Sequence, residues 1–185
     1  MKSYKFLLAL NLCATPFLAS AHNPSHAEYA TSNFTPEDQQ ASLRHKAERL
    51  SAPIKSRADL ERFISSNPGT PLDKLPPIVR ANFIDSLVFK KDGLASLSYA
   101  GLGNFLTISE TYKLLSLFGM QSVTPEISSL PPPSNDVEAF LMIKSNAQPP
   151  VQNNMVCKQI NDTEFDCQVS PNDACDEDTC NSPRN

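Results

Sequence analysis

The chain has 185 residues, with 16 basic and 20 acidic side chains and a formal net charge of −4 when histidine is neutral. Residues 1–21 hold two of the basic side chains and none of the acidic ones, so the remainder carries −6. Nucleic acids and anionic lipids require a basic protein surface, and this charge balance argues against both as partners. The 164 residues that follow position 21 are enough for one ordinary domain.

The first 21 residues have the three parts of a cleavable signal peptide. Lys2 and Lys5 give a positive start, residues 6–14 form an apolar run, and residues 19–21 read Ala-Ser-Ala, an A-x-A cleavage pattern. The apolar run is too short to span a bilayer, which takes about 20 residues. We therefore expect cleavage before His22, a secreted or periplasmic location, and no stable membrane insertion after cleavage.

The segment after the cleavage point is expected to be unstructured before the first helix begins. Residues 22–34 are polar and lack periodicity, which predicts a disordered leader. Thr35 can cap a helix, and Pro36 suits its first turn. This helix has only a thin apolar stripe, so we expect it to be weakly docked. The stripe consists of Leu43, Ala47 and Leu50.

Two further helices are expected before residue 88. Ser56 can cap the first, and Asn67-Pro68-Gly69 stops it. Pro76-Pro77 can open the second. Both have apolar residues at helical spacing, which indicates one buried face each. The inward residues are Leu60, Phe63 and Ile64 in the first helix, and Val79, Phe83 and Leu87 in the second.

A β-hairpin and another helix complete the expected core, residues 54–118. Asp92-Gly93 lies between apolar runs, a strong hairpin signal because glycine tolerates the positive φ of a tight turn. Thr107 and Glu110 have the spacing of a capping box, which opens a helix that ends near Gly119. Farther on, residues 135–144 are expected to form one short helix or strand.

After the signal peptide is removed, four cysteines remain, all within one C-terminal segment: Cys157, Cys167, Cys175 and Cys180. An even number in an exported chain indicates two disulfides. A zinc site is the alternative, but no C-x-x-C pair is present. Placing Cys157 opposite Cys167 on a hairpin favours the pairs 157–167 and 175–180, although the sequence allows three connectivities.

The fold class expected from these patterns is α+β and mostly helical. Short helices surround one β-hairpin, and a Pro-rich spacer and a disulfide-stapled acidic tail follow. We expect a helical and hairpin domain at 35–145, a linker at 146–155 and the tail at 156–185. The apolar residues are concentrated before the spacer, so the tail should share few contacts with the domain.

Two metal sites can be considered from the residues alone. The acidic loop of the tail could offer oxygen ligands to calcium, although it lacks the calcium-loop spacing and glycine. Its candidates are Asp173, Asp176 and Asp178. If cleavage frees His22, its amine and imidazole could chelate copper, and this single residue resembles the N-terminal histidine brace of copper polysaccharide monooxygenases. A brace needs a second histidine, and only His26 and His45 are available.

The sequence contains no catalytic signature. It has no G-x-S-x-G, no H-E-x-x-H and no phosphate-binding glycine loop, so we assign no catalytic residue and no cofactor. We expect an exported, non-enzymatic protein that binds another protein outside the cytoplasm. The alternatives are a small secreted hydrolase or an inhibitor of one, and a metal-binding exported protein. An exposed apolar patch would favour the binding protein, and a concave cluster of carboxylates would favour the enzyme.

Overall fold

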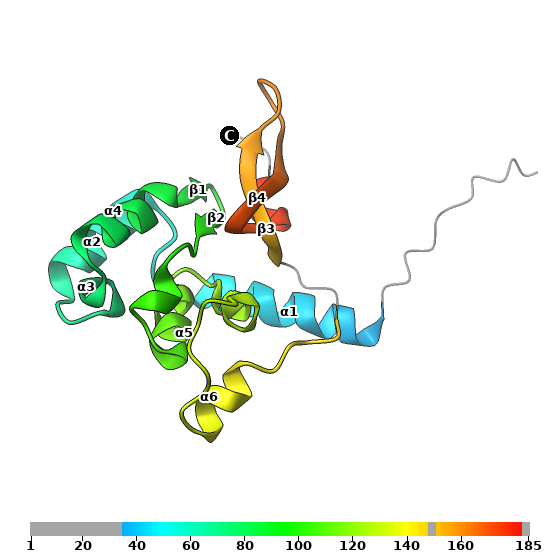
Figure 1. Cartoon of the computed structure of the whole chain (residues 1–185). Coiled ribbons are helices and arrows are strands. Elements are labelled where there is room, and N and C mark those ends of the chain that lie inside the picture. The colour runs from blue at the N-terminus through cyan, green and yellow to red at the C-terminus, as the bar shows by residue number, and fades with distance from the viewer. Residues whose placement is uncertain (1–34, 148–150, 183–185) are drawn as a thin grey trace, which may run out of the picture. The chain divides into compact units, whose positions relative to one another are not determined.

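The structure is a computed structural model that describes residues 35–147 and 151–182 (Figure 1). The expected signal peptide, the leader and His22 lie outside the described residues. None of the described helices has the length and apolar character needed to cross a lipid bilayer.

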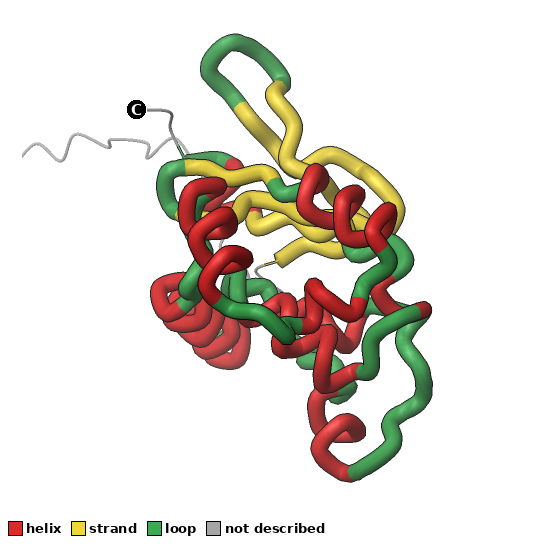
Figure 2. The backbone as a smooth tube through the Cα atoms, turned by 90° about the vertical axis from the view of Figure 1, so that its left-hand side faces the viewer, coloured by secondary structure: helices red, strands yellow, loops and turns green. Residues whose placement is uncertain are grey.

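A four-stranded antiparallel sheet, with strand order β1-β2-β4-β3, lies among the helices (Figures 1 and 2). Its strands are β1 (Val88–Lys90), β2 (Gly93–Ser98), β3 (Val151–Gln159) and β4 (Phe165–Asp176). The described helices are α1 (Pro36–Ser51), α2 (Arg57–Ser66), α3 (Pro71–Lys74), α4 (Pro77–Ser86), α5 (Ile108–Ser116), α6 (Asp136–Leu141) and α7 (Glu177–Cys180), with short 3-10 helices η1 (Leu102–Asn104) and η2 (Gln121–Glu126).

The helix starts follow the capping residues of the sequence. Thr35 and Ser56 accept hydrogen bonds from backbone amides in the first turns of α1 and α2, and Thr107 forms a complete capping box with Glu110 at α5. The ambiguous segment 135–144 contains helix α6, capped by Asn135. Helix α3, also opened by a capping box, was not expected.

The hydrophobic core is built on the predicted segment 54–118 and extends beyond it. Leu60, Phe83 and Leu115 are buried, as their helical spacing predicted. The core also takes up Met120, Val123 and Ile127, which follow that segment within the expected domain. Val151 from the expected linker and Ala174 from the expected tail belong to it as well, which the sequence did not indicate.

Both predicted hairpins are present, and the second has the predicted register. In the first, Lys90 pairs with Gly93 across the turn. In the second, Cys157 lies opposite Cys167, and the neighbouring pairs follow the predicted order. The expectation of one hairpin beside a separate tail is wrong, however, because both hairpins belong to one sheet.

Strand β4 joins the two hairpins by pairing with β2 as well as with β3. Leu97 pairs with Ala174, and the backbone N–H of Tyr99 donates to the carbonyl of Asn172 over 2.8 Å. The predicted linker 146–155 is also wrong in part, because β3 begins at Val151. The cysteine segment therefore shares a sheet and a core with the helical part, and the expectation of few contacts between them is wrong.

The β3–β4 hairpin bends where two asparagines adopt positive φ values, 57° at Asn154 and 63° at Asn172. Asn153 of β3 pairs with Ala174 of β4, and the next pair is Met155 with Val169. Asn154 on β3 and residues 170–173 on β4 are therefore left out of the β3–β4 pairing. Of residues 170–173, Asp173 pairs with Ser98 of β2 and Asn172 accepts a hydrogen bond from the backbone N–H of Tyr99. The outer part of the hairpin projects from the rest of the sheet in both views (Figures 1 and 2).

Candidate functional site

Helix α1 presents its polar side to the protein and its apolar stripe to solvent, the reverse of the prediction. Leu43 and Leu50 are 61% and 66% exposed, whereas His45 is only 2% exposed. Glu48 and Arg49 lie on the same inward side and are partly buried. Polar contacts therefore fix α1 in place, and their partner lies at the other end of the sequence.

That partner is Asp176, which is 1% exposed and caps the short helix α7. One oxygen of its carboxylate, Oδ2, lies 3.1 Å from Nε2 of His45 and accepts a hydrogen bond from Nη1 of Arg49, also over 3.1 Å. The hydroxyl of Thr179 donates to the same oxygen over 2.7 Å, and the Thr179 amide donates to the other oxygen over 3.3 Å. A buried carboxylate with this many donors is well compensated for its loss of water.

The groups around Asp176 lower its pKa. Burial alone would raise the pKa of Asp176, but the hydrogen bond and charge of His45, with smaller contributions from Thr179 and Arg49, hold it below its usual value. An ionised carboxylate can only accept, so Nε2 of His45 must carry a proton. In the neutral imidazole, Nδ1 is then left as an acceptor.

Glu48 lies on the other side of the imidazole, with Oε2 4.0 Å from Nδ1 of His45. Burial raises the pKa of Glu48, and the charges of His45 and Arg44 offset this only in part. Oε2 is buried and has no hydrogen-bond partner among the described residues. This carboxylate is therefore much less well compensated than Asp176.

His45 and Glu48 line a cleft of about 510 Å³ between α1, η2, the α6 segment and β3. Its walls combine apolar side chains, among them Tyr112, Phe140 and Ile143, with polar and charged ones. A concave site where apolar side chains and convergent polar groups meet is the usual form of a ligand-binding site. This cleft is therefore the candidate functional site.

The cleft gathers polar atoms that have no partner. Of the buried side-chain atoms without a hydrogen bond in the described residues, four belong to residues that line it: Nδ1 of His45, Oε2 of Glu48, Oε1 of Gln121 and Oδ1 of Asn153. Buried polar groups are nearly always paired, so such a concentration at one site needs an explanation.

An exposed apolar surface borders the cleft. We call it the α6 patch: Val137, Phe140 and Ile143, which are 65%, 71% and 67% exposed. Helix α6 is held in this orientation by Glu138, whose carboxylate accepts hydrogen bonds from the Ser109 amide over 3.2 Å and the Ser134 amide over 3.0 Å. These bonds, chiefly those from Ser134, lower the pKa of Glu138 to about 2. Phe140 and Ile143 also line the cleft, so the patch and the cleft are continuous.

The four cysteines form two disulfides, as predicted, but with a different connectivity. Cys157 is bonded to Cys180 and Cys167 to Cys175. The favoured pairs 157–167 and 175–180 are wrong because the hairpin bends. Residues eight apart on a straight strand would be separated by roughly 26 Å, whereas the Cα atoms of Cys167 and Cys175 are 5.9 Å apart.

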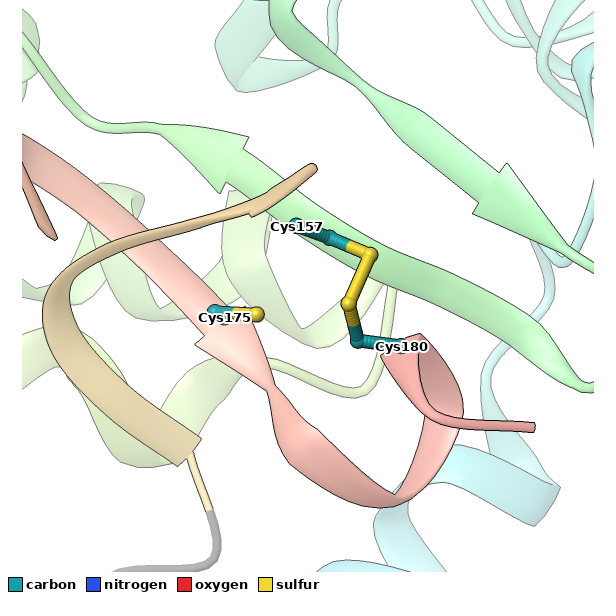
Figure 3. Close-up of side chains that lie close together, drawn as sticks. All are labelled: Cys157, Cys175 and Cys180. Carbon is teal, nitrogen blue, oxygen red and sulfur yellow. A yellow bond between two sulfur atoms is a disulfide. The ribbon is translucent and has the colours of Figure 1, made fainter. Parts of the chain in front are cut away.

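The sulfur atoms of Cys157, Cys175 and Cys180 lie within 4.8 Å of one another (Figure 3). Within the described residues, these are the ligand atoms of metal-binding type that come close enough together to hold an ion. Disulfide sulfur is not the thiolate that zinc binds, so the oxidised cluster serves as a staple.

The weak metal candidates from the sequence are placed apart. Asp176 is engaged by His45 and Arg49, Asp173 accepts a hydrogen bond from Ser170, and Asp178 is exposed. His22 lies outside the described residues, and His45, considered as its possible copper partner, is bonded to Asp176.

The sequence analysis considered His45 only as a copper partner of His22, and it did not find Glu48 or the cleft. The apolar stripe Leu43-Ala47-Leu50 predicted that this face of α1 is buried, whereas it is exposed. The available signal was the opposite face, where His45 and Arg49 are one turn apart and can contact the same partner. The role of Asp176 as a helix cap could also have been predicted, because an aspartate can accept a hydrogen bond from the backbone N–H three residues later, here that of Thr179.

A histidine held by a carboxylate also occurs in general-base catalysis, where the other ring nitrogen meets the substrate. Here Nδ1 of His45 is buried, and Asp176 fixes the ring on its other side. The pair therefore acts as a structural connection between α1 and α7. Comparisons with protein-family models, curated proteins and solved structures find no match to this chain.

Proposed function

We propose that this chain is an exported, non-enzymatic protein that binds a segment of another protein through the α6 patch and the adjoining cleft. The observation that carries the proposal is the exposure of Phe140 and Ile143 at the cleft rim. Large exposed apolar side chains that gather beside a cleft are typical of interaction sites.

The form of the site favours a protein segment over a small molecule. A small ligand is usually enclosed by its pocket, whereas Val137 lies outside the cleft and Phe140, on its rim, is 71% exposed. A partner segment can cover the projecting side chains and place one of its own side chains into the cleft. Aromatic and apolar anchors of this kind provide much of the energy of protein interfaces.

An address outside the reducing cytoplasm is supported by the cysteines. The described cysteines are all paired in disulfides, which persist in oxidising compartments and are rare where glutathione keeps thiols reduced. The signal-peptide pattern of residues 1–21 supports the same address. A secreted or periplasmic location is therefore part of the proposal.

The test compares two double variants of the full chain with its disulfides formed. In the first, Phe140→Ser and Ile143→Ser remove the α6 patch. In the second, Ile160→Ser and Val169→Ser remove apolar side chains that are comparably exposed on the β3–β4 hairpin. Each protein is immobilised and used to capture partners from the medium into which it is released, and the affinity of the captured partner is then measured.

We expect the α6 variant to weaken binding at least about tenfold, the equivalent of one lost anchor residue. The hairpin variant should bind as the unchanged protein does. Hydrogen exchange in the complex should slow at residues 137–143. Equal binding by all three proteins, or protection confined to another surface, would rule out the α6 patch as the binding site.

A further inference from the structure

We infer that the cleft receives a cationic side chain of the partner, an ammonium or guanidinium group that donates hydrogen bonds to Glu48, Gln121 and Asn153. This inference rests on the proposed function and adds the chemistry of the bound group. It is based on the buried polar atoms of the cleft that have no hydrogen-bond partner among the described residues.

Each of these unpartnered atoms accepts hydrogen bonds. Oε2 of Glu48, Oε1 of Gln121 and Oδ1 of Asn153 are oxygens, and Nδ1 of His45 is an acceptor in the neutral imidazole. Leaving a buried acceptor unsatisfied costs free energy, more so when it is charged. Arg44 and Lys144 also line the cleft, but its unpartnered buried oxygens are acceptors. Acceptors that lack a donor are complementary to a group that offers several donors, as ammonium and guanidinium groups do.

The charges in and around the cleft favour the same group at Glu48. Lys144 is paired with Glu126 over 2.7 Å, so these two charges compensate each other. Behind the imidazole, Asp176 is paired with Arg49. Two side chains can place a positive charge near Glu48. They are His45, when its imidazole is protonated, and Arg44, whose side chain is exposed. An entering cation would meet a carboxylate that is neither hydrogen-bonded nor closely paired with a lysine or arginine.

The side chains that hold these oxygens can reach a ligand. Glu48, Gln121 and Asn153 are only partly buried and line the cleft, so their side chains are not enclosed on every side by the protein. His45, by contrast, is fixed by Asp176. The aliphatic stem of a lysine or arginine would pack against the apolar rim that Phe140 and Ile143 form, while its charged end lies deeper.

The experiment titrates the full oxidised chain with blocked amino acids and follows backbone amide shifts by NMR. The cationic probes are Nα-acetyl-lysine and Nα-acetyl-arginine N-methylamides. Their neutral counterparts of similar shape are the norleucine and citrulline derivatives. We expect saturable shifts at residues 41–48, 121–126 and 153 with the cationic probes, and at least fivefold weaker binding of the neutral ones.

Charge variants check the role of Glu48. Glu48→Gln should weaken the cationic probes at least fivefold, whereas Glu61→Gln, an equal charge change on the exposed side of α2, should leave them unchanged. If Glu48→Gln does not fold, the comparison of cationic and neutral probes on the unchanged protein decides alone.

The possible results separate this inference from the proposed function. Equal binding of charged and neutral probes at the cleft overturns the cationic group and leaves the binding role of the cleft intact. Absence of cleft shifts with every probe also overturns the inference, even if partner capture depends on the α6 patch. Capture that does not depend on Phe140 and Ile143 overturns the proposed function itself.

Discussion

Replacing Asp176 by asparagine tests whether α1 is held by its polar contacts. The substitution keeps the shape of the side chain and removes the charge. Three side-chain donors now meet the Asp176 carboxylate: His45, Arg49 and Thr179. The amide oxygen can take the place of Oδ2 and accept from all three donors, but without the negative charge. The amide nitrogen then takes the place of Oδ1 and faces the backbone N–H of Thr179, so that contact becomes donor against donor.

The cost can be worked out from these contacts. A hydrogen bond to a charged group contributes about 1.5–3 kcal/mol and a neutral one about 0.5–1.5 kcal/mol, so each of three bonds loses about 1 kcal/mol. The total of about 3 kcal/mol is at the lower end of the cost of breaking a buried ion pair, about 3–5 kcal/mol. The lower end is reasonable because the Arg49 side chain is 16% exposed and keeps some water.

The assay is thermal unfolding at neutral pH with both disulfides intact, followed by far-UV circular dichroism. A loss of about 3 kcal/mol should lower Tm by about 6–12 °C in a protein of this size. Asp178→Asn is the matched control, because Asp178 is exposed and lies two residues away. Hydrogen exchange at residues 36–51 should also become faster in Asp176→Asn alone. A decrease in Tm below 2 °C, or one equal to that of the control, would refute the account of how α1 is docked.

Three other perturbations have definite expected outcomes. A Cβ on Gly119 would lie 2.7 Å from the Cα of Arg49, whereas one on Gly69 would meet no atom within 4 Å, and both residues have positive φ. Gly119→Ala should therefore lower Tm clearly more than Gly69→Ala, and equal effects would show that the close approach to α1 is unimportant. The pKa of Glu138 is lowered to about 2 in the folded protein, so its ionised carboxylate stabilises the fold above about pH 4.5. The difference in Tm between the unchanged protein and Glu138→Gln should therefore disappear as the pH falls through about 2. A Tm difference that does not change with pH would contradict this. Leu115 is fully buried, and Leu115→Ala should cost about 2–5 kcal/mol in denaturant unfolding, while an unchanged midpoint would place α5 outside the core.

Local features of the fold could be predicted from the sequence because they depend on residues that are near one another in the chain. Asp92-Gly93 placed the first hairpin, and Thr107 with Glu110 placed the start of α5. The register of the second hairpin followed from pairing cysteines across a short turn. In each case, a few neighbouring residues determine the backbone geometry.

The pairing of β2 with β4 could not be predicted in this way, because residues 97 and 174 are brought together by the whole fold. The disulfide connectivity failed for a related reason. The bend depends on Asn154 and Asn172 adopting positive φ, which the sequence permits but does not require. Without the bend, Cys157 and Cys167 would have been each other's nearest partners.

The candidate site was missed because its residues come from distant segments. His45 is 131 residues from Asp176, and nothing near either residue indicates the other. The cleft adds Asn153 from β3 and Phe140 from the α6 segment to α1. An exposed apolar patch is the expected mark of a binding protein, but its position on α6 depends on the tertiary fold.

The separation of His45 and Asp176 has a consequence for the synthesis of the protein. Translation proceeds at about 5–20 residues per second, so Asp176 is added roughly 7–26 s after His45. Throughout that interval, α1 has neither its carboxylate partner nor the strand that carries it. In a nascent chain that ends before β4, helix α1 would be undocked and accessible to proteases and chaperones. In the complete chain, α1 is held by its contacts with Asp176. Helix α1 can therefore dock in its final position only after β4 and Asp176 have been synthesised.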